Sequence, residues 1–263
     1  MATAFPPWCT PLAGMGWRAG LLPVLALLQS LLIGQLPALA GDGGAPLGPA
    51  KGLLLDPAAL GRVSGTPPAP GSREEAGDLA ILLWQQRYRT PEMVAATWLL
   101  LDRSLSTFSG AVGAELGSST PLLKAGLEAL MPPVNIAYRA IKARQARVRP
   151  YIAHPELRPC LPPEATGCFP SGHAVWFRFT AELLADLLPE RRERLEHVDT
   201  QGGANRVLCG VHCPSDVERF GAAAARQIIA SPQWRAFRED PALQAELLRL
   251  RAPGREALPP LVR

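Results

Sequence analysis

Three kinds of pattern are missing from this 263-residue sequence, and each absence disfavours a class of structure or function. No block of lysine and arginine stands out and the net charge is only +4, which disfavours a nucleic-acid-binding role. Apolar and polar residues do not alternate as they do in half-buried strands, which disfavours a sheet. Beyond residue 40 no apolar stretch is long enough to span a bilayer, so we expect no membrane helix in the mature chain.

The first forty residues carry a single charge, Arg18, and contain the apolar run GLLPVLALLQSLLIG. The segment PALAGD follows, in which Ala38 and Ala40 form an A-x-A cleavage site. We therefore predict that residues 1–40 are a secretory signal peptide and that the protein is periplasmic or secreted. The alternative is an uncleaved membrane anchor, which the prolines and glutamines within the run disfavour.

Cleavage at that site removes Cys9 and leaves an even number of cysteines, which suggests disulfides in an exported chain. The candidates are Cys160, Cys168, Cys209 and Cys213. Four cysteines allow three pairings, and the sequence does not choose among them. A zinc site fits poorly because the C-x7-C and C-x3-C spacings match no common finger pattern, so we expect no metal.

Helix signals recur along the rest of the chain. Residues 41–71 are rich in glycine and proline and predict an N-terminal arm around the short apolar anchor LLLDPAAL. Ser72 and Glu75 then form a capping box that begins a helix. Further helices are expected to begin at Thr90–Pro91, at Thr120–Pro121, near Pro133, after the motif PSGH and near Pro214. We predict an all-α, single-domain helical bundle over residues 72–240, followed by a weakly ordered C-terminal tail, 241–263.

The first polar block is KARQARVRP, in which Lys142 and Arg149 lie seven residues apart. Seven residues are two helical turns, so both side chains are expected on one face before Pro150 stops the helix. Two cations directed at one place can hold a dianion. The alternative is an ordinary solvated basic surface.

The second block is PSGH, at the start of a long apolar stripe. If a helix begins near His173, then Ser171 and the amide of Gly172 lie at its positive end, where an anion is favoured. The imidazole of His173 can there donate a proton to a leaving oxygen. Ser171 can equally serve as a plain N-cap.

The third block is NRVLCGVHCPSD. Arg206 offers a planar fork that suits phosphate oxygens. His212 precedes Asp216 by four residues, a spacing at which the carboxylate can fix the imidazole tautomer and leave a nitrogen free as a nucleophile. The alternative is a structural hydrogen bond between the two.

Together, in this order, the blocks resemble the signature Lys-x6-Arg-Pro, Pro-Ser-Gly-His and Ser-Arg-x5-His-x3-Asp of the phosphatidic acid phosphatase type 2 (PAP2) and vanadium haloperoxidase superfamily. Asn205 stands where that signature has serine. Within the superfamily, residues 52–235 are similar to bacterial class A non-specific acid phosphatases. The likeness includes the LLLDP…PPAPGS arm, the RTPE helix start and NRVLCGVHCPSDVERFG.

The resemblance implies roles for particular residues. His212 would attack phosphorus and become a phosphohistidine, Asp216 would orient it, and His173 would protonate the departing alcohol. The groups implied to bind phosphate are Lys142, Arg149, Ser171, the amide of Gly172 and Arg206. The implied activity is metal-independent hydrolysis of phosphate monoesters such as nucleotides, sugar phosphates and aryl phosphates, with no protein-bound cofactor. Relatives often associate, so a homo-oligomer is also implied.

Departures from the pattern leave alternatives open. Besides Asn205, Cys213 replaces the usual aromatic residue after His212, and Ala174 follows PSGH where threonine is more common. A vanadium haloperoxidase would hold vanadate in the same cradle, but those chains are much longer. The non-enzymatic alternative is a secreted protein that binds phosphate without turning it over.

Overall fold

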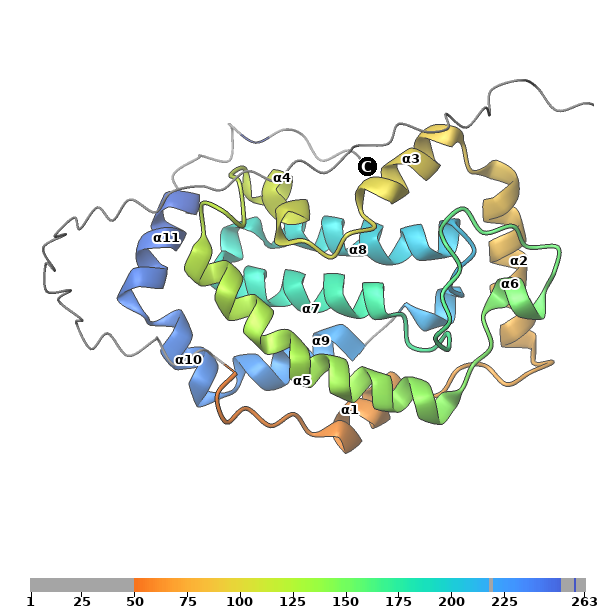
Figure 1. Cartoon of the computed structure of the whole chain (residues 1–263), viewed down its shortest axis with the longest axis horizontal. Coiled ribbons are helices and arrows are strands. Elements are labelled where there is room, and N and C mark those ends of the chain that lie inside the picture. Colours follow the sequence, from red (N-terminus) through yellow and green to blue (C-terminus); the bar gives the residue numbers. More distant parts are fainter. Residues whose placement is uncertain (1–49, 218–219, 252–257, 259–263) are drawn as a thin grey trace, which may run out of the picture. The chain divides into compact units, whose positions relative to one another are not determined.

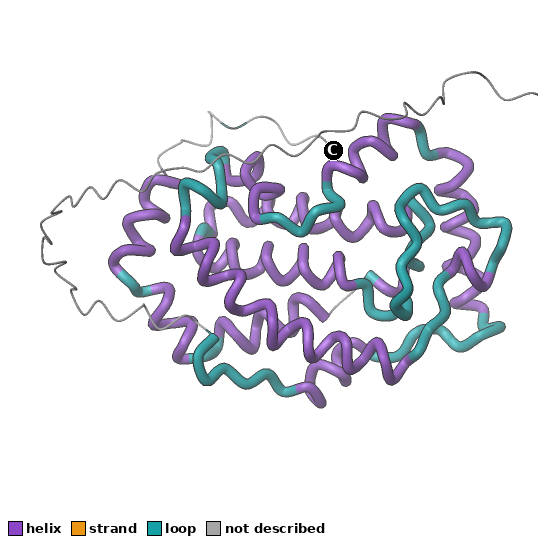
Figure 2. Tube along the Cα trace, in the orientation of Figure 1, coloured by secondary structure: helices purple, strands orange, loops and turns teal. Residues whose placement is uncertain are grey.

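The computed structural model describes residues 50–217, 220–251 and 258, which form helices and loops with no strand among them (Figures 1 and 2). The prediction of an all-α fold is confirmed for this part of the chain. The predicted signal peptide, residues 1–40, lies outside it. In the same described residues, no helix has the length and apolar character needed to cross a membrane.

Two long helices, α7 (Gly172–Leu187) and α8 (Arg192–Leu208), pack along each other at the centre of the fold, and α9 (Phe220–Ile229) packs against α7 (Figure 1). The helix α7 is apolar on nearly every side and most of its residues are buried, as expected for a central helix. Its contact with α8 is close because Gly202 of α8 faces the ring of Phe177.

The helix α5 (Pro121–Gln145) crosses this centre and buries an apolar face that continues along its whole length. The sequence predicted two helices here, the second beginning near Pro133. The structure instead has one helix that includes Pro132 and Pro133. Two prolines remove two backbone donors, but burial of Leu130 and Val134 on either side holds the segment in one helix.

The predicted start signals near the N-terminal end of the domain are confirmed. The Ser72 hydroxyl accepts from the Glu75 amide at the start of α2, and the Thr90 hydroxyl accepts from the Met93 amide at the start of α3. The other helical segments surround the centre. They are α1 (Pro57–Ser64), α2 (Arg73–Tyr88), α3 (Pro91–Leu99), η1 (Leu105–Phe108), α4 (Ser109–Val112), α6 (Pro150–Ala153), η2 (Pro189–Arg191), η3 (Pro214–Asp216), α10 (Pro232–Arg238) and α11 (Pro241–Arg251).

The expectation of a weakly ordered tail is wrong for residues 241–251, which form α11. Leu243 and Leu247 of this helix are buried in the main core. The Glu246 carboxylate accepts from the amides of Leu122 and Leu123 at 3.0 Å each, and so caps the start of α5. The remainder of the predicted tail lies outside the described residues, except for residue 258.

The helix expected from Pro214 also differs. Residues 214–216 form the short turn η3, and the α-helix begins at Phe220. In the arm, the anchor LLLDPAAL contains a helix, α1, whose Leu60 is fully buried. The anchor prediction is therefore supported, although the segment is helical rather than extended.

Candidate active site

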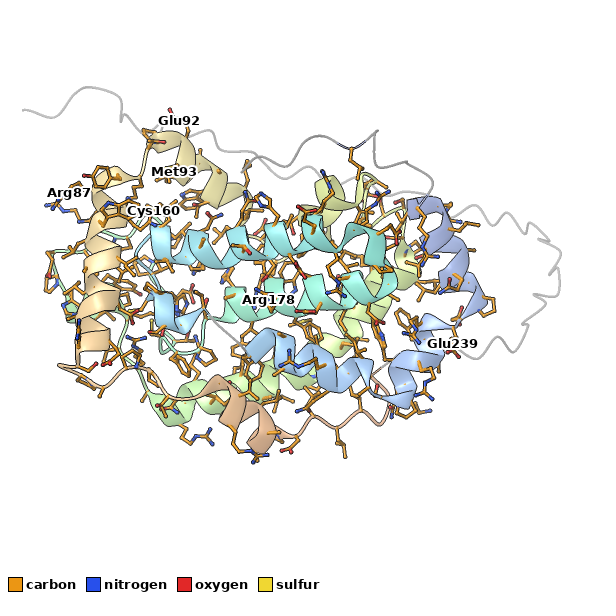
Figure 3. All side chains as sticks on the ribbon, turned by 180° about the vertical axis from the view of Figure 1, so that it is seen from behind. Arg87, Glu92, Met93, Cys160, Arg178 and Glu239 are labelled. Carbon is orange, nitrogen blue, oxygen red and sulfur yellow. A yellow bond between two sulfur atoms is a disulfide. The ribbon has the colours of Figure 1, made fainter. Side chains whose placement is uncertain are left out.

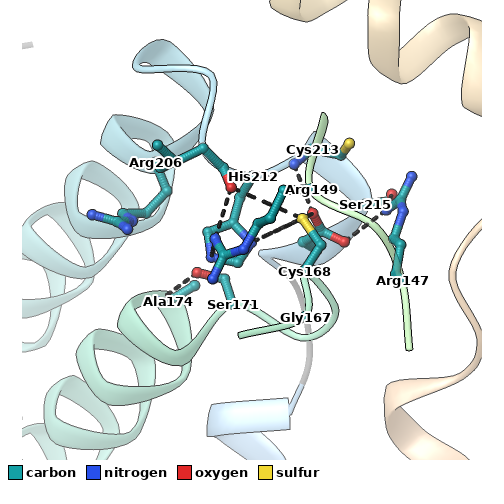
Figure 4. Close-up of polar contacts among 12 residues, drawn as sticks. Arg147, Arg149, Gly167, Cys168, Ser171, Ala174, Arg206, His212, Cys213 and Ser215 are labelled. Atoms are coloured by element: carbon teal, nitrogen blue, oxygen red, sulfur yellow. Dashed lines mark hydrogen bonds and ion pairs between the residues drawn. The ribbon is translucent and has the colours of Figure 1, made fainter. Parts of the chain in front are cut away.

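The predicted site residues come from five segments of the chain, and Figure 4 shows Arg149, Ser171, Arg206 and His212 among them. They are Lys142 on α5, Arg149 before α6, Ser171–His173 at the start of α7, Arg206 on α8, and His212 and Asp216 in the loop and turn that follow. Backbone hydrogen bonds join these segments, from the Ser171 amide to the Asp216 carbonyl and from the His212 amide to the Arg206 carbonyl.

The sequence predicted that Lys142 and Arg149 come together because they share one face of a helix, and that reason is wrong. The helix α5 ends at Gln145, and Ala146 turns the chain with φ of 45°, so the two cations do not share a helix face. Arg149 is instead the residue before α6. The turn brings the two cations to the same loop, because Lys142 donates to the Gly167 carbonyl at 2.7 Å and Arg149 Nε donates to the Thr166 carbonyl at 2.9 Å.

His212 is fully buried, and its Nε2 lies 2.8 Å from Nη1 of Arg149. A guanidinium only donates, so Nε2 must be the accepting nitrogen and Nδ1 must carry the ring proton. That Nδ1 lies 3.5 Å from Oδ2 of Asp216. Burial, together with the charges of Arg149 and Lys142, lowers the pKa of His212 to about 3 against the opposing effect of Asp216. The imidazole is therefore neutral, and its Nε2 lone pair points to Arg149. We call the three cations Lys142, Arg149 and Arg206 the cradle.

Asp216 is held by donors from three other residues besides its contact with His212. Its carboxylate accepts from the Cys213 amide at 2.7 Å, from the Cys168 thiol at 2.8 Å and from Nη1 of Arg147 at 2.6 Å. Burial by itself would raise the pKa of this carboxyl, but His212 and Arg147 hold it well below its ordinary value. Asp216 is thus a fixed anion behind the imidazole.

Sequence reasoning missed the group that fixes Asp216. Arg147 joins it to α2, because Nη2 of Arg147 lies 2.9 Å from Oδ2 of Asp78. Ser215 accepts from Arg147 at 2.7 Å and donates to Asp78. Arg147 lies inside the first motif, but the spacing alone did not distinguish it from its neighbours.

Sequence reasoning also missed Glu164. Its carboxylate accepts from Nη2 of Arg149 at 2.7 Å and from Nη2 of Arg206. Burial would raise the pKa of Glu164, but the two guanidinium groups lower it to about 2. A carboxylate therefore stands between the two arginines predicted to bind phosphate.

The catalytic acid candidate, His173, lies on the wall of a cavity of about 730 Å³ that Glu164, Trp176 and Arg206 also line. Its Nε2 lies 3.0 Å from the Leu101 carbonyl and so carries a proton. Burial, together with the charges of Arg206 and Arg103, lowers the pKa of His173 to about 4. The ring faces a space large enough for the organic part of a small ester.

Ser171 has the alternative role considered from the sequence. Its hydroxyl accepts from the Ala174 amide at 3.4 Å and caps α7, while the residue itself is fully buried. Gly172 begins the sixteen-residue helix, and a Cβ there would lie 3.2 Å from the hydroxyl of Tyr138. The positive end of α7 is thereby placed beside the cations.

The cysteines divide into two kinds. Cys160 and Cys209 form a disulfide that joins the loop before Glu164 to the end of α8; Cys160 is labelled in Figure 3. Cys168 and Cys213 are free and buried, so the expectation that they also form a disulfide is wrong. Both lie beside Asp216, where the Cys168 thiol and the Cys213 amide are needed as donors.

Cys168, His212 and Asp216 offer possible ligand atoms within 4.8 Å of one another, an arrangement that can hold a metal ion. Burial, however, raises the pKa of the Cys168 thiol, which donates its proton to Asp216. A metal at this position would require that proton to leave, and also the proton on Nδ1 of His212. The group fits a hydrogen-bonded cluster better than a metal centre.

The chain is similar in sequence to several known proteins. The chain is 30% identical over 152 residues to a non-specific acid phosphatase of Salmonella typhi, covering 55% of this chain and 58% of that protein. A non-specific acid phosphatase of Salmonella typhimurium is 31% identical over 85 residues, 32% of each chain. One of Providencia stuartii is 27% identical over 117 residues, covering 43% of this chain and 45% of that protein.

The predicted resemblance to the non-specific acid phosphatases is therefore confirmed, over about a third to three fifths of the length of these relatives. No family model matches the chain. Among solved structures, the crystal structure of a transmembrane PAP2 type phosphatidylglycerolphosphate phosphatase from Bacillus subtilis has a TM-score of 0.44 and 19% identity. The match covers 60% of this chain and 84% of the Bacillus subtilis chain.

Proposed function

We propose that the protein is a phosphoric monoester hydrolase, a periplasmic or secreted acid phosphatase that acts through a phosphohistidine. One observation carries the proposal. A buried, neutral histidine, His212, directs its Nε2 lone pair at Arg149, within a cluster that also contains Lys142 and Arg206. Similarity to non-specific acid phosphatases supports the same activity.

In the proposed first step, the phosphoryl group enters the cradle and takes Arg149 as a partner in place of the imidazole. Nε2 of His212 attacks phosphorus, the P–N bond forms and the P–O bond to the alcohol breaks. His173 gives its proton to the departing oxygen. Water then attacks phosphorus and gives a proton to the neutral His173, the P–N bond breaks with its electron pair returning to Nε2 of His212, and inorganic phosphate leaves. Throughout, Lys142, Arg149 and Arg206 stabilise charge on the non-bridging oxygens.

Asp216 has a separate part in this scheme. The ring of His212 gains positive charge as the P–N bond forms, and its Nδ1–H faces the Asp216 carboxylate. Because Asp216 is held by Arg147 and by the Cys213 amide, it can stabilise that charge without moving. The cations of the cradle supply the charge that a metal supplies elsewhere, so we propose that turnover needs no metal.

We propose that the rate is greatest at acid pH. The pKa of His173 is lowered to about 4, so its protonated, acid-competent fraction grows as the pH falls below neutrality. A bound phosphate near the ring adds negative charge and raises that pKa in the complex. Export is supported by the Cys160–Cys209 disulfide, which is typical of oxidising compartments.

Substrate breadth follows from the same geometry. The cavity beyond His173 is lined by mixed side chains, including Arg103, Met131, Asn135 and Trp176, and it does not enclose one shape of alcohol. The three cations that we assign to phosphate are Lys142, Arg149 and Arg206, and Arg103 is the further cation named in the cavity lining. We therefore propose that nucleotides, sugar phosphates and aryl phosphates are all accepted.

The test measures release of inorganic phosphate from p-nitrophenyl phosphate and from a nucleotide by the mature protein, with chelator present, from acid to neutral pH. Acid-favoured, chelator-resistant turnover is expected. No turnover from either ester would exclude the hydrolase, and vanadate loading followed by peroxide and halide would then test the haloperoxidase alternative.

The variant His212→Ala tests the nucleophile. Loss of the attacking nitrogen should lower kcat by about four orders of magnitude or more, because the covalent route is closed. Far-UV circular dichroism should be unchanged, since the surrounding helices do not depend on the imidazole. Normal turnover in a folded His212→Ala protein would show that another group attacks phosphorus.

A further inference from the structure

The carboxylate of Glu164 occupies the position that the proposed function gives to phosphate. Its two oxygens accept separately from Arg149 and Arg206, so it bridges the two guanidinium groups. Arg149 and Arg206 are each only 2% exposed, whereas the Glu164 side chain keeps a third of its surface. The anion is therefore the accessible partner, and the cations are fixed.

The rest of the same loop occupies the remaining cradle donors. The carbonyl of Gly167 accepts from Lys142, the carbonyl of Thr166 accepts from Nε of Arg149, and the Thr166 hydroxyl accepts from Nη2 of Arg149. Each of the three cations thus has at least one partner within residues 164–167. The loop stands in for oxygens that a phosphate would bring.

The match between the carboxylate and the cradle is incomplete. Nε and Nη1 of Arg206 are buried and have no hydrogen-bond partner among the described residues. A buried unpaired donor is costly, and a carboxylate has only two oxygens to offer. A phosphate monoester brings three non-bridging oxygens and up to two negative charges, so it can satisfy donors that Glu164 leaves unpaired.

The structure also provides space into which the carboxylate can move. Glu164 lines the cavity of about 730 Å³ together with Pro162 and Pro163, and His212 is not among its lining residues. The loop begins at the disulfide-bonded Cys160 and ends at the buried Cys168. Because both ends are held, the simplest displacement is rotation of the Glu164 side chain out of the cradle.

We propose that Glu164 is an internal competitor for phosphate, a carboxylate that substrate displaces from Arg149 and Arg206 and that returns when inorganic phosphate leaves. This inference rests on the proposed function. Its consequence is a cradle that binds phosphate less tightly than its three cations alone would, since each binding event must first break two charged hydrogen bonds. Glu164 thereby raises KM and limits inhibition by the product.

The test uses isothermal titration of inorganic phosphate into the mature wild-type protein, Glu164→Gln and Glu156→Gln. Glutamine keeps the size of the side chain but removes its charge, so Glu164→Gln should lower the Kd for phosphate by about tenfold or more. The matched control removes an exposed carboxylate that precedes the same loop and contacts His154 rather than the cradle, so it should leave Kd unchanged.

Steady-state kinetics distinguish a Glu164 that competes with phosphate from a Glu164 that positions the two arginines. An internal competitor predicts that Glu164→Gln lowers KM for p-nitrophenyl phosphate and makes phosphate a stronger product inhibitor, with kcat equal to or below that of the wild type. A carboxylate that merely positions the arginines predicts the reverse, a raised KM and weaker phosphate binding. Either an unchanged or a raised Kd in Glu164→Gln overturns the proposal.

A crystal structure of the wild-type protein with inorganic phosphate provides a second measurement that needs no variant. Displacement of Glu164 from both arginines supports the proposal, and a phosphate bound while Glu164 still contacts both arginines overturns it. A wild-type protein that neither binds phosphate nor hydrolyses p-nitrophenyl phosphate would instead defeat the proposed function itself. Failure of the competitor role alone leaves turnover and phosphate binding in place.

Discussion

Arg147 fixes the orientation of Asp216, although it makes no hydrogen bond to the proposed nucleophile, His212. It holds two buried carboxylates, Asp78 of α2 and Asp216, and its own side chain is 9% exposed. Burial would lower the pKa of this guanidinium, but Asp216 and Asp78 raise it above its ordinary value. Such a pair is costly to break because the remaining charges stay buried.

The substitution Arg147→Met should therefore lower the free energy of unfolding by about 3–5 kcal/mol and reduce kcat as Asp216 loses its fixed position. The matched control is Arg144→Met, three residues earlier, which removes an exposed arginine at the end of α5. Urea unfolding and steady-state kinetics measure both effects. Equal behaviour of the two variants would show that Arg147 does not hold the site.

Residues at fixed spacing within the motifs were predictable from the sequence, and the structure brings all of them together. Glu164 and Arg147 were not predictable, because each acts through partners on distant segments. Glu164 is an acidic residue in a proline-rich loop and becomes significant only when the chain folds it against Arg149 and Arg206. The position of the Cys168 thiol depends in the same way on its hydrogen bond to Asp216.

At the scale of elements, the packing of α7 on α8 makes a sharp prediction about two adjacent glycines. A Cβ at Gly202 would lie 2.6 Å from Cδ1 of Phe177 and closer still to two other ring carbons. A Cβ at Gly203 would make only ordinary contacts, 3.7 Å from Val217 and 3.8 Å from Ala174. Both positions lie inside the same helix, so alanine brings each about the same gain in helix propensity.

Gly202→Ala should destabilise the fold by about 2 kcal/mol or more, because the ring of Phe177 must move within a close-packed core. Gly203→Ala should be neutral or stabilising by up to about 1 kcal/mol. Thermal and urea unfolding of the two variants provide the comparison. Equal stability of both would mean that the two helices are not packed as closely as the structure has them.

Helix starts were more predictable than helix extents. The caps Ser72 and Thr90 predict the starts of α2 and α3 correctly, because an N-cap is a local interaction. Whether a helix continues depends on what it packs against, which is why α5 passes through Pro132 and Pro133. The same reason applies to α11. Its leucines repeat at helical spacing, but the sequence does not show the core against which they pack.

At the scale of the whole molecule, the buried titratable groups predict how stability depends on pH. Below about pH 6.5 the unfolded chain protonates its histidines, while the folded chain resists until about 4 at His173 and about 3 at His212. The unfolded state then binds more protons, so the free energy of unfolding falls as the pH drops through this window.

Asp199 acts in the opposite direction. Burial raises its pKa to about 7, although Arg178 (labelled in Figure 3) contacts it at 2.7 Å, so the folded chain takes up a proton there as the pH falls from about 7 to 4. The two histidines outnumber it, and we expect a net loss of stability on acidification. Removing the opposing group in Asp199→Asn should make that loss larger.

Differential scanning fluorimetry at pH 7 and pH 4.5 tests this balance in the wild type and in Asp199→Asn. Inorganic phosphate should offset part of the loss, because a ligand that binds only the folded state stabilises it and its charge favours protonated histidines. A wild-type Tm that rises on acidification would contradict the expected dominance of the two buried histidines.

The hydrogen bond from Arg149 to His212 also lowers the reactivity of His212 toward electrophiles that acylate or alkylate imidazoles. Such reagents need an accessible nitrogen lone pair, and in His212 one nitrogen carries a proton, the other is bonded to Arg149, and the ring is fully buried. His154, His173 and His197 keep part of their surface, and we expect them to be labelled before His212. His212 is thus a latent nucleophile, shielded from neutral reagents and unmasked by an anion that draws Arg149 away.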